Sequence, residues 1–218
     1  MGKGQVLRVG SVTSTQDVAR ELPIGSIVVA DHQSAGRGRL DRRWDAPSGT
    51  ALLVSFVLER NPILSLAAGV AAAEACGDPV RLKWPNDLLL DGRKLGGILV
   101  EVSADRAVCG IGINLTWAPE GAAQLSQPRD EVLNRLREEI GRWTAAPADV
   151  VMRRWRKLSA TLGRRVRVEL AGHTTEGLAE DIGPHGELIV DGVAFVAGSL
   201  THLGDERSRA GPPPSGHG

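Results

Sequence analysis

The sequence predicts an α+β protein, in which a mixed sheet flanked by helices is followed by a small all-β unit. Up to residue 162, short apolar runs alternate with segments whose apolar residues recur at helical spacing, such as Leu133, Leu136 and Ile140. From residue 165 to residue 203, short alternating strands are separated by turns that contain glycine. A chain of 218 residues with 42% hydrophobic content can bury the core of one main domain and a small one.

The first half of the chain is expected to supply the strands of the main sheet. Ser14 offers an N-cap for a helix over residues 15–22, and an alanine-rich helix over residues 64–76 ends at Gly77. Apolar runs predict strands over residues 6–9, 26–30, 50–59, 80–84 and 107–115.

A hairpin should occupy the stretch KWPNDLLLDGRKLGGILVE, residues 83–101. Two apolar runs flank Asp91-Gly92, a pair that favours the positive φ of a tight turn. Pro85 bars the residue before it from helical geometry, so Asn86 and Asp87 should lie at a strand-to-strand corner. Lys94 stands beside Gly96-Gly97, and glycines within a strand mark close approach of backbone or ligand. This is a site for an anionic or carboxyl-bearing small molecule, or only a tight corner and a bulge.

The second half should contain a loop, two helices and the all-β unit. A loop over residues 116–128 precedes helices at 129–143 and 148–162, which Pro147 separates. About five short strands over residues 165–203 would form a small barrel that docks on the larger part. We therefore expect a catalytic domain over residues 1–162, a small domain over 163–204 and a disordered tail over 205–218.

Residues 31–49 form a long irregular segment with four arginines and three glycines. Such a segment in a compact domain is usually functional or disordered. Glycines let the backbone wrap around a ligand, and arginines bind phosphate oxygens in a forked geometry. Neither the Walker nor the Rossmann spacing is present. A solvated basic loop and an RG-rich RNA-binding segment are the competing interpretations. We expect the segment to be mobile without ligand and to order around one.

Charge and cysteine content exclude several classes of function. Formal net charge is zero, so no global field favours nucleic acid or membrane. Cys76 and Cys109 lie in apolar surroundings and are interpreted as free buried thiols in a reducing compartment. No signal peptide, membrane span or metal-type histidine spacing is apparent. The sequence therefore predicts a soluble cytoplasmic protein.

The motifs GRGR…W and KWPND…KLGG together resemble the signature of biotin protein ligases, and the similarity runs from about residue 11 to about residue 203. The resemblance implies a class II synthetase-like mixed sheet and an SH3-like C-terminal β-barrel. Because the pattern begins within the first dozen residues, it also implies the monofunctional type without a DNA-binding domain. Gln16 departs from the pattern, since the family often has Asn after Ser-Thr.

The implied activity has two steps. Biotin and ATP give biotinyl-5′-AMP and pyrophosphate, and biotin then passes to a lysine of a biotin carboxyl carrier domain of an acyl-CoA carboxylase. Mg²⁺ should accompany ATP. The implied enzyme works without nucleic acid or membrane, as a monomer or homodimer. A lipoate ligase of the same fold, a DNA-binding biotin sensor and a non-catalytic biotin-binding module are the alternatives.

The resemblance also implies roles for individual residues. The implied catalytic residues are Lys94, Arg39 and Asp87. Asp87 would either hold the metal or accept the proton of the incoming lysine. Implied biotin-binding residues are Ser14, Thr15, Gln33, Arg37, Gly38, Arg39, Lys94, Gly96 and Gly97. Implied ATP-binding residues are Arg37, Arg39, Trp44, Asn86, Lys94 and Asn114. On local pattern alone, the run at Ser14 is a helix cap and Asn114 is a turn-forming residue at a strand end.

Overall fold

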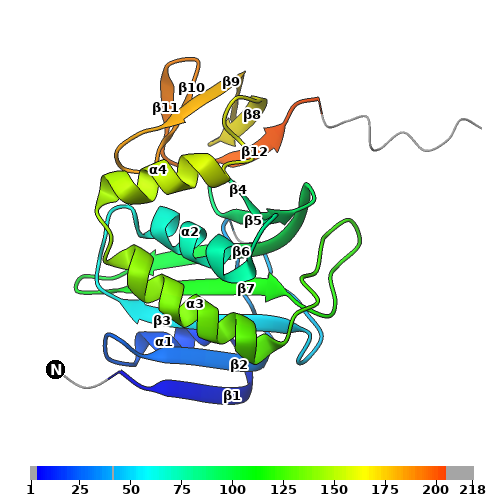
Figure 1. Cartoon of the computed structure of the whole chain (residues 1–218), viewed down its shortest axis with the longest axis vertical. Coiled ribbons are helices and arrows are strands. Elements are labelled where there is room, and N and C mark those ends of the chain that lie inside the picture. The colour runs from blue at the N-terminus through cyan, green and yellow to red at the C-terminus, as the bar shows by residue number, and fades with distance from the viewer. Residues whose placement is uncertain (1–3, 41, 205–218) are drawn as a thin grey trace, which may run out of the picture.

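A seven-stranded sheet forms the centre of the computed structural model, which describes residues 4–40 and 42–204 (Figure 1). The strand order is β1-β2-β3-β7-β6-β5-β4, with β1 and β2 parallel and every other neighbouring pair antiparallel. The predicted mixed sheet is confirmed. Its strands are β1 (Val6–Val12), β2 (Ile27–Gln33), β3 (Ala51–Leu58), β4 (Arg81–Lys83), β5 (Asp87–Leu90), β6 (Arg93–Val102) and β7 (Ala107–Asn114).

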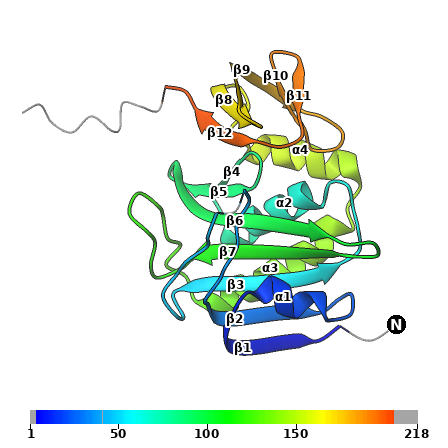
Figure 2. The same ribbon diagram turned by 180° about the vertical axis from the view of Figure 1, so that it is seen from behind.

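Helices cover the two faces of this sheet unequally. α2 (Leu64–Cys76) and α3 (Arg129–Thr144) lie on one face, and the short α1 (Thr15–Arg20) lies on the other (Figures 1 and 2). α2 is buried almost all round because α3 and α4 (Ala148–Leu158) pack against it, and its alanines permit close approach. The short α1 leaves part of its own sheet face for the loop between β2 and β3.

A second, smaller sheet follows the helices and confirms the predicted five-stranded unit. Its order is β11-β10-β9-β8-β12, antiparallel throughout. It docks on the main part through the Trp84 indole, which donates to the carbonyl oxygen of Gly186 at 3.0 Å. Arg156 of α4 pairs with Asp181 of β9. The five strands are β8 (Arg165–Leu170), β9 (His173–Ile182), β10 (Leu188–Val190), β11 (Val193–Phe195) and β12 (Ser199–His202).

Several predicted boundaries were wrong. β6 begins at Arg93, directly after the Asp91-Gly92 turn and before the apolar run, because Arg93 and Lys94 already pair with β5. α4 ends at Leu158, four residues early, because the Ser159 hydroxyl accepts hydrogen bonds from the backbone N–H groups of residues 161 and 162. The backbone N–H of Ala160 donates to the carbonyl oxygen of Leu82, which connects the chain after α4 to β4.

Both cysteines are buried free thiols, as predicted. Burial raises the pKa of Cys76 and of Cys109 to about 12, so both stay protonated and unreactive. Among residues 4–40 and 42–204, no helix has the length and apolar character needed to cross a membrane. The predicted tail, residues 205–218, lies outside the described residues, and the division at residues 162 and 163 stays a prediction.

Candidate active site

A cavity of about 360 Å³ opens on the sheet face that carries α1. Its walls are the N-terminus of α1, the corner between β4 and β5, strands β6 and β7, and the arginine loop. We use this last name for residues 34–50, of which residue 41 is not described. The cavity is lined by most of the residues that the sequence singled out: Ser14, Thr15, Gln33, Arg37, Gly38, Arg39, Trp44, Asn86, Asp87, Lys94 and Gly97.

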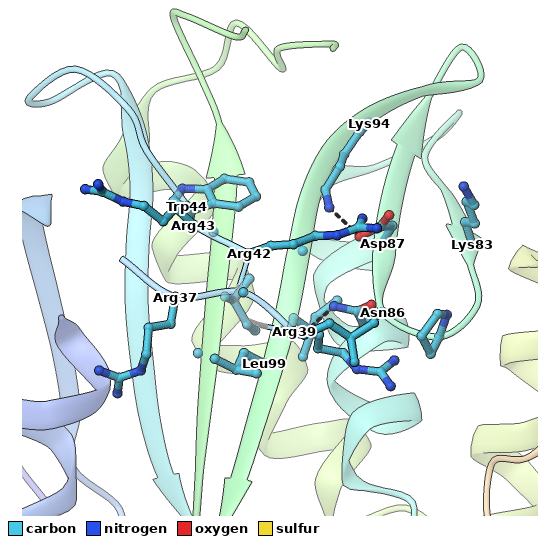
Figure 3. Close-up of a pocket in the computed structure, with 18 of the residues that line it drawn as sticks. Arg37, Arg39, Arg42, Arg43, Trp44, Lys83, Asn86, Asp87, Lys94 and Leu99 are labelled. Carbon is cyan, nitrogen blue, oxygen red and sulfur yellow. Dashed lines mark hydrogen bonds and ion pairs between the residues drawn. The ribbon is translucent and has the colours of Figure 1, made fainter. Parts of the chain in front are cut away.

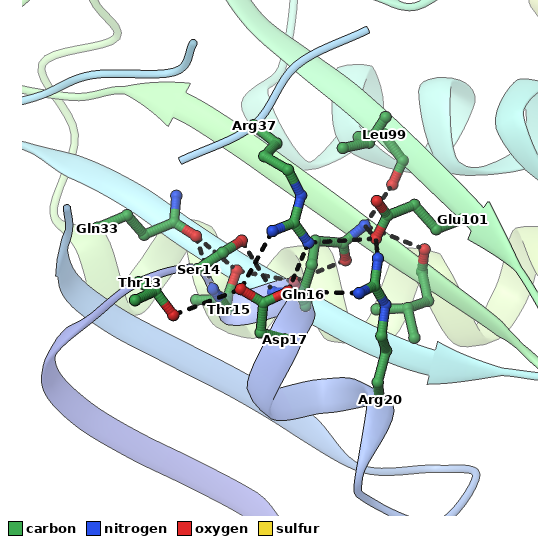
Figure 4. A network of polar contacts seen from close by, with 12 residues as sticks. Thr13, Ser14, Thr15, Gln16, Asp17, Arg20, Gln33, Arg37, Leu99 and Glu101 are labelled. Carbon is green, nitrogen blue, oxygen red and sulfur yellow. Dashed lines mark hydrogen bonds and ion pairs between the residues drawn. The ribbon is translucent and has the colours of Figure 1, made fainter. Parts of the chain in front are cut away.

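Buried polar side chains form one end of the cavity (Figure 4). The backbone N–H and the hydroxyl of Thr15 both donate to the side-chain oxygen of Gln33, at 2.7 and 3.0 Å. Ser55 lies beneath them and its hydroxyl is 2.8 Å from that of Thr15 and 3.0 Å from the side-chain oxygen of Gln16. Ser14 caps α1 as predicted, since its hydroxyl accepts from the backbone N–H of Gln16. This end can recognise a ligand with several donors and acceptors.

The arginine loop folds back across the open sheet face. The backbone of Arg37 pairs with that of Arg43 in an antiparallel bridge, and Trp44 donates its backbone N–H to the carbonyl oxygen of Gly36. The Trp44 ring lies on β7 at Gly112, where an added Cβ would come within 2.6 Å of the ring. Only glycine at this strand position lets the indole sit flat on the backbone. The buried indole nitrogen of Trp44 has no partner among the described residues.

Two carboxylates hold the Arg37 guanidinium at the edge of α1 (Figure 4). It donates to both carboxylate oxygens of Asp17, at 3.1 and 2.7 Å, and lies 3.6 Å from Glu101. The hydrogen bond from Arg37 holds the pKa of Asp17 below its usual range, and the same bond raises the pKa of Arg37. This forked geometry is that of a strong charge-assisted pair.

The corner between β4 and β5 forms the facing wall (Figure 3). Its base is Trp84, which is 2% exposed. The side-chain amide of Asn86 donates to the carbonyl oxygen of Ile98 at 2.7 Å, and Asp87 pairs with the Lys94 ammonium at 2.6 Å. Desolvation lowers the pKa of Arg39, while the charge of Asp87 opposes the shift. Lys94, Arg39 and Asp87 therefore meet at the end of the cavity away from Thr15, where an anionic group would be bound.

Two predicted site residues are not part of the cavity lining. A Cβ at Gly96 would lie 2.6 Å from the carbonyl oxygen of Gly112, so this glycine permits close packing of β6 on β7. The amide of Asn114 is buried and donates to the carbonyl oxygen of Ala123 at 2.9 Å. Both residues shape the walls from behind.

The sequence reasoning missed residues that support the cavity from behind and residues of the small domain. Asp17 and Glu101 hold the arginine loop, and a carboxylate at the start of a helix beside an arginine-rich loop was the available signal. In the sequence, Gly112 is only one of several glycines in predicted strands, and its contact with Trp44 is not indicated. β12 and the turn before it also line the cavity, and Arg42 donates to the Ser199 hydroxyl at 3.0 Å. No local pattern marks such a contact, which joins positions 157 residues apart.

The cavity therefore has neutral hydrogen-bonding groups at one end and convergent cations at the other, as in a site for a ligand with a polar part and an anionic part. Residues 6–116 match the Biotin/lipoate A/B protein ligase family, and residues 161–198 match the Biotin protein ligase C terminal domain. The chain belongs to the biotin/lipoate A/B protein ligase family.

Relatives within this family cover much of the chain. The biotin--[acetyl-CoA-carboxylase] ligase of Mycobacterium tuberculosis is 35% identical, and the match covers 82% of this chain and 79% of that protein. The bifunctional ligase/repressor BirA of Bacillus subtilis is 38% identical, but the match covers 57% of this chain and 47% of BirA. A biotin protein ligase from Aquifex aeolicus, solved in complex with biotin and ATP, has a TM-score of 0.80 at 27% identity; the match covers 91% of this chain and 99% of that one.

Proposed function

We propose that this protein is a biotin protein ligase, which activates biotin with ATP and transfers it to a lysine of a biotin carboxyl carrier domain. The observation that carries the proposal is the polarity of the cavity: neutral hydrogen-bonding groups around Thr15 at one end, cations around Lys94 at the other. Biotin has the same asymmetry, with a ureido ring at one end and a carboxylate at the other. The relatives' names support this choice.

The Thr15 end would bind the ureido ring. Its donors and acceptors, namely the hydroxyls of Ser14 and Thr15 and the amide of Gln33, match a group that needs both. The dithiolane ring of lipoate would desolvate the same polar groups without replacing their hydrogen bonds. This is the observation that favours biotin over lipoate, the second candidate substrate. Gly97 and Gly38 would leave room for the ligand along the cavity.

The Lys94 end would carry the chemistry. An oxygen of the biotin carboxylate attacks the α-phosphorus of ATP, and the bond from that phosphorus to pyrophosphate breaks. Lys94 and Arg39 would bind the reacting carboxylate and the phosphate and stabilise the charge that develops between them. Trp44 would face the adenine ring, and Asn86 would line the nucleotide side. Gly96 and Asn114 would contribute by shaping the walls.

Mg²⁺ fits this site as an ion carried by the nucleotide. Within the described ranges no three His, Cys, Asp or Glu side chains converge on a metal position, but Mg²⁺ needs only one or two carboxylates when phosphates supply other ligands. Asp87, on the cavity wall, is the residue that would hold it. The ion would neutralise the charge of the leaving pyrophosphate.

In the second step, the acceptor lysine amine attacks the acyl carbon of biotinyl-AMP and AMP leaves. The amine must lose a proton, and Asp87 is the carboxylate at the cationic end that could accept it if it does not hold the metal. We further propose that the enzyme works in the cytoplasm, as a monomer or homodimer and without nucleic acid. A gel shift with its own operon promoter would test the last point.

The decisive experiment measures exchange of labelled pyrophosphate into ATP by the purified protein. We expect exchange that depends on biotin and not on lipoate, followed by labelling of a carrier domain but not of its acceptor Lys→Arg variant. Exchange with lipoate alone would make the protein a lipoate ligase. Biotin binding without any exchange would make it a non-catalytic module.

A further inference from the structure

Arg37 stands in the motif that predicted phosphate binding, yet its guanidinium is directed away from the cationic end of the cavity. Figure 3 shows Arg37 on the opposite side of the loop from Arg39, Asp87 and Lys94. Both terminal nitrogens of Arg37 bind the carboxylate of Asp17, and one also lies 3.6 Å from Glu101. Both nitrogens that would bind a phosphate in a forked geometry are therefore already paired with protein carboxylates.

The position of Arg37 in the loop makes this pairing mechanically important. Arg37 forms the antiparallel bridge with Arg43 at which the loop turns back on itself. Just before it, Gly36 is buried so closely against the carbonyl oxygen of Trp44 and the amide of Gln33 that a side chain has no space there. A tether at this point would fix the base of the loop, from which the turn that carries Arg39 extends.

Asp17 belongs to α1, the same helix whose first turn supplies Ser14 and Thr15. Glu101 belongs to β6, the strand that carries Lys94. Arg20 of α1 also donates to Glu101, at 2.8 Å, so the Arg37 tether connects the loop to α1 and β6 at the Thr15 end of the cavity. Gln16 reinforces this connection, since its amide donates to Glu101 at 3.0 Å while its side-chain oxygen accepts from Ser55.

We infer that Arg37 is a positioning residue, which fastens the arginine loop to Asp17 and Glu101 so that Arg39 and Trp44 are presented to the nucleotide. This inference rests on the proposed function and refines it: the sequence predicted that Arg37 binds biotin and ATP, whereas here phosphate binding belongs to Arg39 and Lys94. Asp17 and Glu101 become positioning residues for the same reaction.

A double-mutant cycle tests the assignment, with Asp17→Asn, Arg37→Gln and the combined variant. The readouts are KM for ATP and for biotin in pyrophosphate exchange, together with the rate at which trypsin cleaves the ligand-free loop at Arg42 and Arg43. If Arg37 is a tether, each single variant raises loop cleavage and KM for ATP about fivefold, and the double variant is no worse than either single one.

Arg20→Gln is the matched control. Arg20 pairs with the same two carboxylates, at 3.4 Å from Asp17 and 2.8 Å from Glu101, but it lies on α1 and not on the loop. We expect its loop cleavage and KM for ATP to stay near wild type. Arg37→Lys provides a second variant that keeps the charge and loses the forked geometry, and it should resemble Arg37→Gln.

The tether is wrong if Arg37→Gln raises KM for ATP while Asp17→Asn leaves KM unchanged or lowers it. That result would mean that Arg37 binds phosphate, because loss of the Asp17 carboxylate would free its guanidinium to do so. Loop cleavage and KM for ATP near the wild-type values in Arg37→Lys would also contradict the tether. Absence of biotin-dependent exchange in the wild-type protein would overturn the proposed function instead. Cleavage of the ligand-free loop would still report on the tether, since it requires no activity.

Discussion

The two walls of the cavity are built in opposite ways. The arginine loop is held by ion pairs whose side chains are 27–38% exposed, and by one indole resting on Gly112. The opposing corner is held from within: Trp84 is 2% exposed, its backbone N–H donates to Thr161 and its indole donates to Gly186. Polar, exposed contacts give little stability and open easily, whereas buried packing with satisfied hydrogen bonds stays closed.

This difference suggests a division of labour. The corner that carries Asn86 and Asp87 is a fixed surface against which substrate can be aligned, and the small domain takes part by supporting it from behind. We expect the arginine loop to be the movable element, which closes once ligand supplies partners for its arginines. Contact between Arg42 and Ser199 shows that the loop also reaches the small domain.

Removing the cation of the fixed wall should have the largest effect. Lys94→Ala should lower the rate of biotin-dependent pyrophosphate exchange at least about a hundredfold, because a preorganised charge at the reacting centre contributes on the order of 3 kcal/mol. Far-UV circular dichroism should be unchanged. Arg93→Ala, one position away and outside the cavity lining, is the control and should stay near wild type. Exchange within a few-fold of wild type would remove Lys94 from the chemistry.

Gly112→Ala should disable the movable wall alone. The added methyl group would come within 2.6 Å of the Trp44 ring, so the indole must leave its place on β7. We expect KM for ATP to rise about tenfold while the affinity for biotin, measured by calorimetry without ATP, changes little. Gly10→Ala, on β1 with nothing within 4 Å of the added group, controls for a strand glycine. An unchanged KM for ATP would mean that Trp44 does not help to bind nucleotide.

Trp84→Phe should weaken the fixed wall. It removes the donor to the partly buried carbonyl oxygen of Gly186, at a cost of about 1 kcal/mol in the free energy of unfolding. We also expect a reduction of kcat by a few-fold, since the corner with Asp87 loses its support. Trp143→Phe is the control, because the Trp143 indole donates to Glu139 far from the cavity. This variant should lose stability without a change in kcat. Equal kcat losses in both variants would contradict a local role for Trp84.

The smallest expected effect is the pH dependence of the tether. Because Arg37 holds the folded-state pKa of Asp17 below its usual range, the pair contributes stability above the unfolded pKa, near 3.8, and loses it as the pH falls through the folded pKa. Urea unfolding should therefore show wild type more stable than Asp17→Asn at pH 7, by less than about 1 kcal/mol for such exposed groups. That difference should shrink below about pH 4. A difference that grows on acidification would contradict the sign.

Local chemistry predicted much of this molecule from the sequence. The Asp91-Gly92 turn, the Ser14 cap and the change to short strands after residue 162 each act within a few residues, and the structure confirms them. Family resemblance then identified eleven predicted site residues that do line one cavity. It did not predict the pairing of Arg37 with Asp17 and Glu101, because a motif specifies a residue type and not the partner that reaches it from elsewhere.

The residues that the sequence did not reveal share one property: their partners are distant along the chain. Arg37 of the arginine loop meets Glu101 of β6, and Trp84 meets Gly186 across 102 positions. Nothing in the local pattern around Gly112 indicates that an indole rests on it. Such contacts follow from strand order and packing, which depend on the whole fold.

Hydrogen exchange of the two walls, measured by mass spectrometry with and without biotin and ATP, tests the contrast between them most directly. Without ligand, amides of residues 37–44 should exchange much faster than those of residues 82–90. With both ligands, the loop should gain strong protection and the corner should change little. The account is contradicted if the loop is already as protected as the corner before ligand is added, or if both walls gain protection to the same degree.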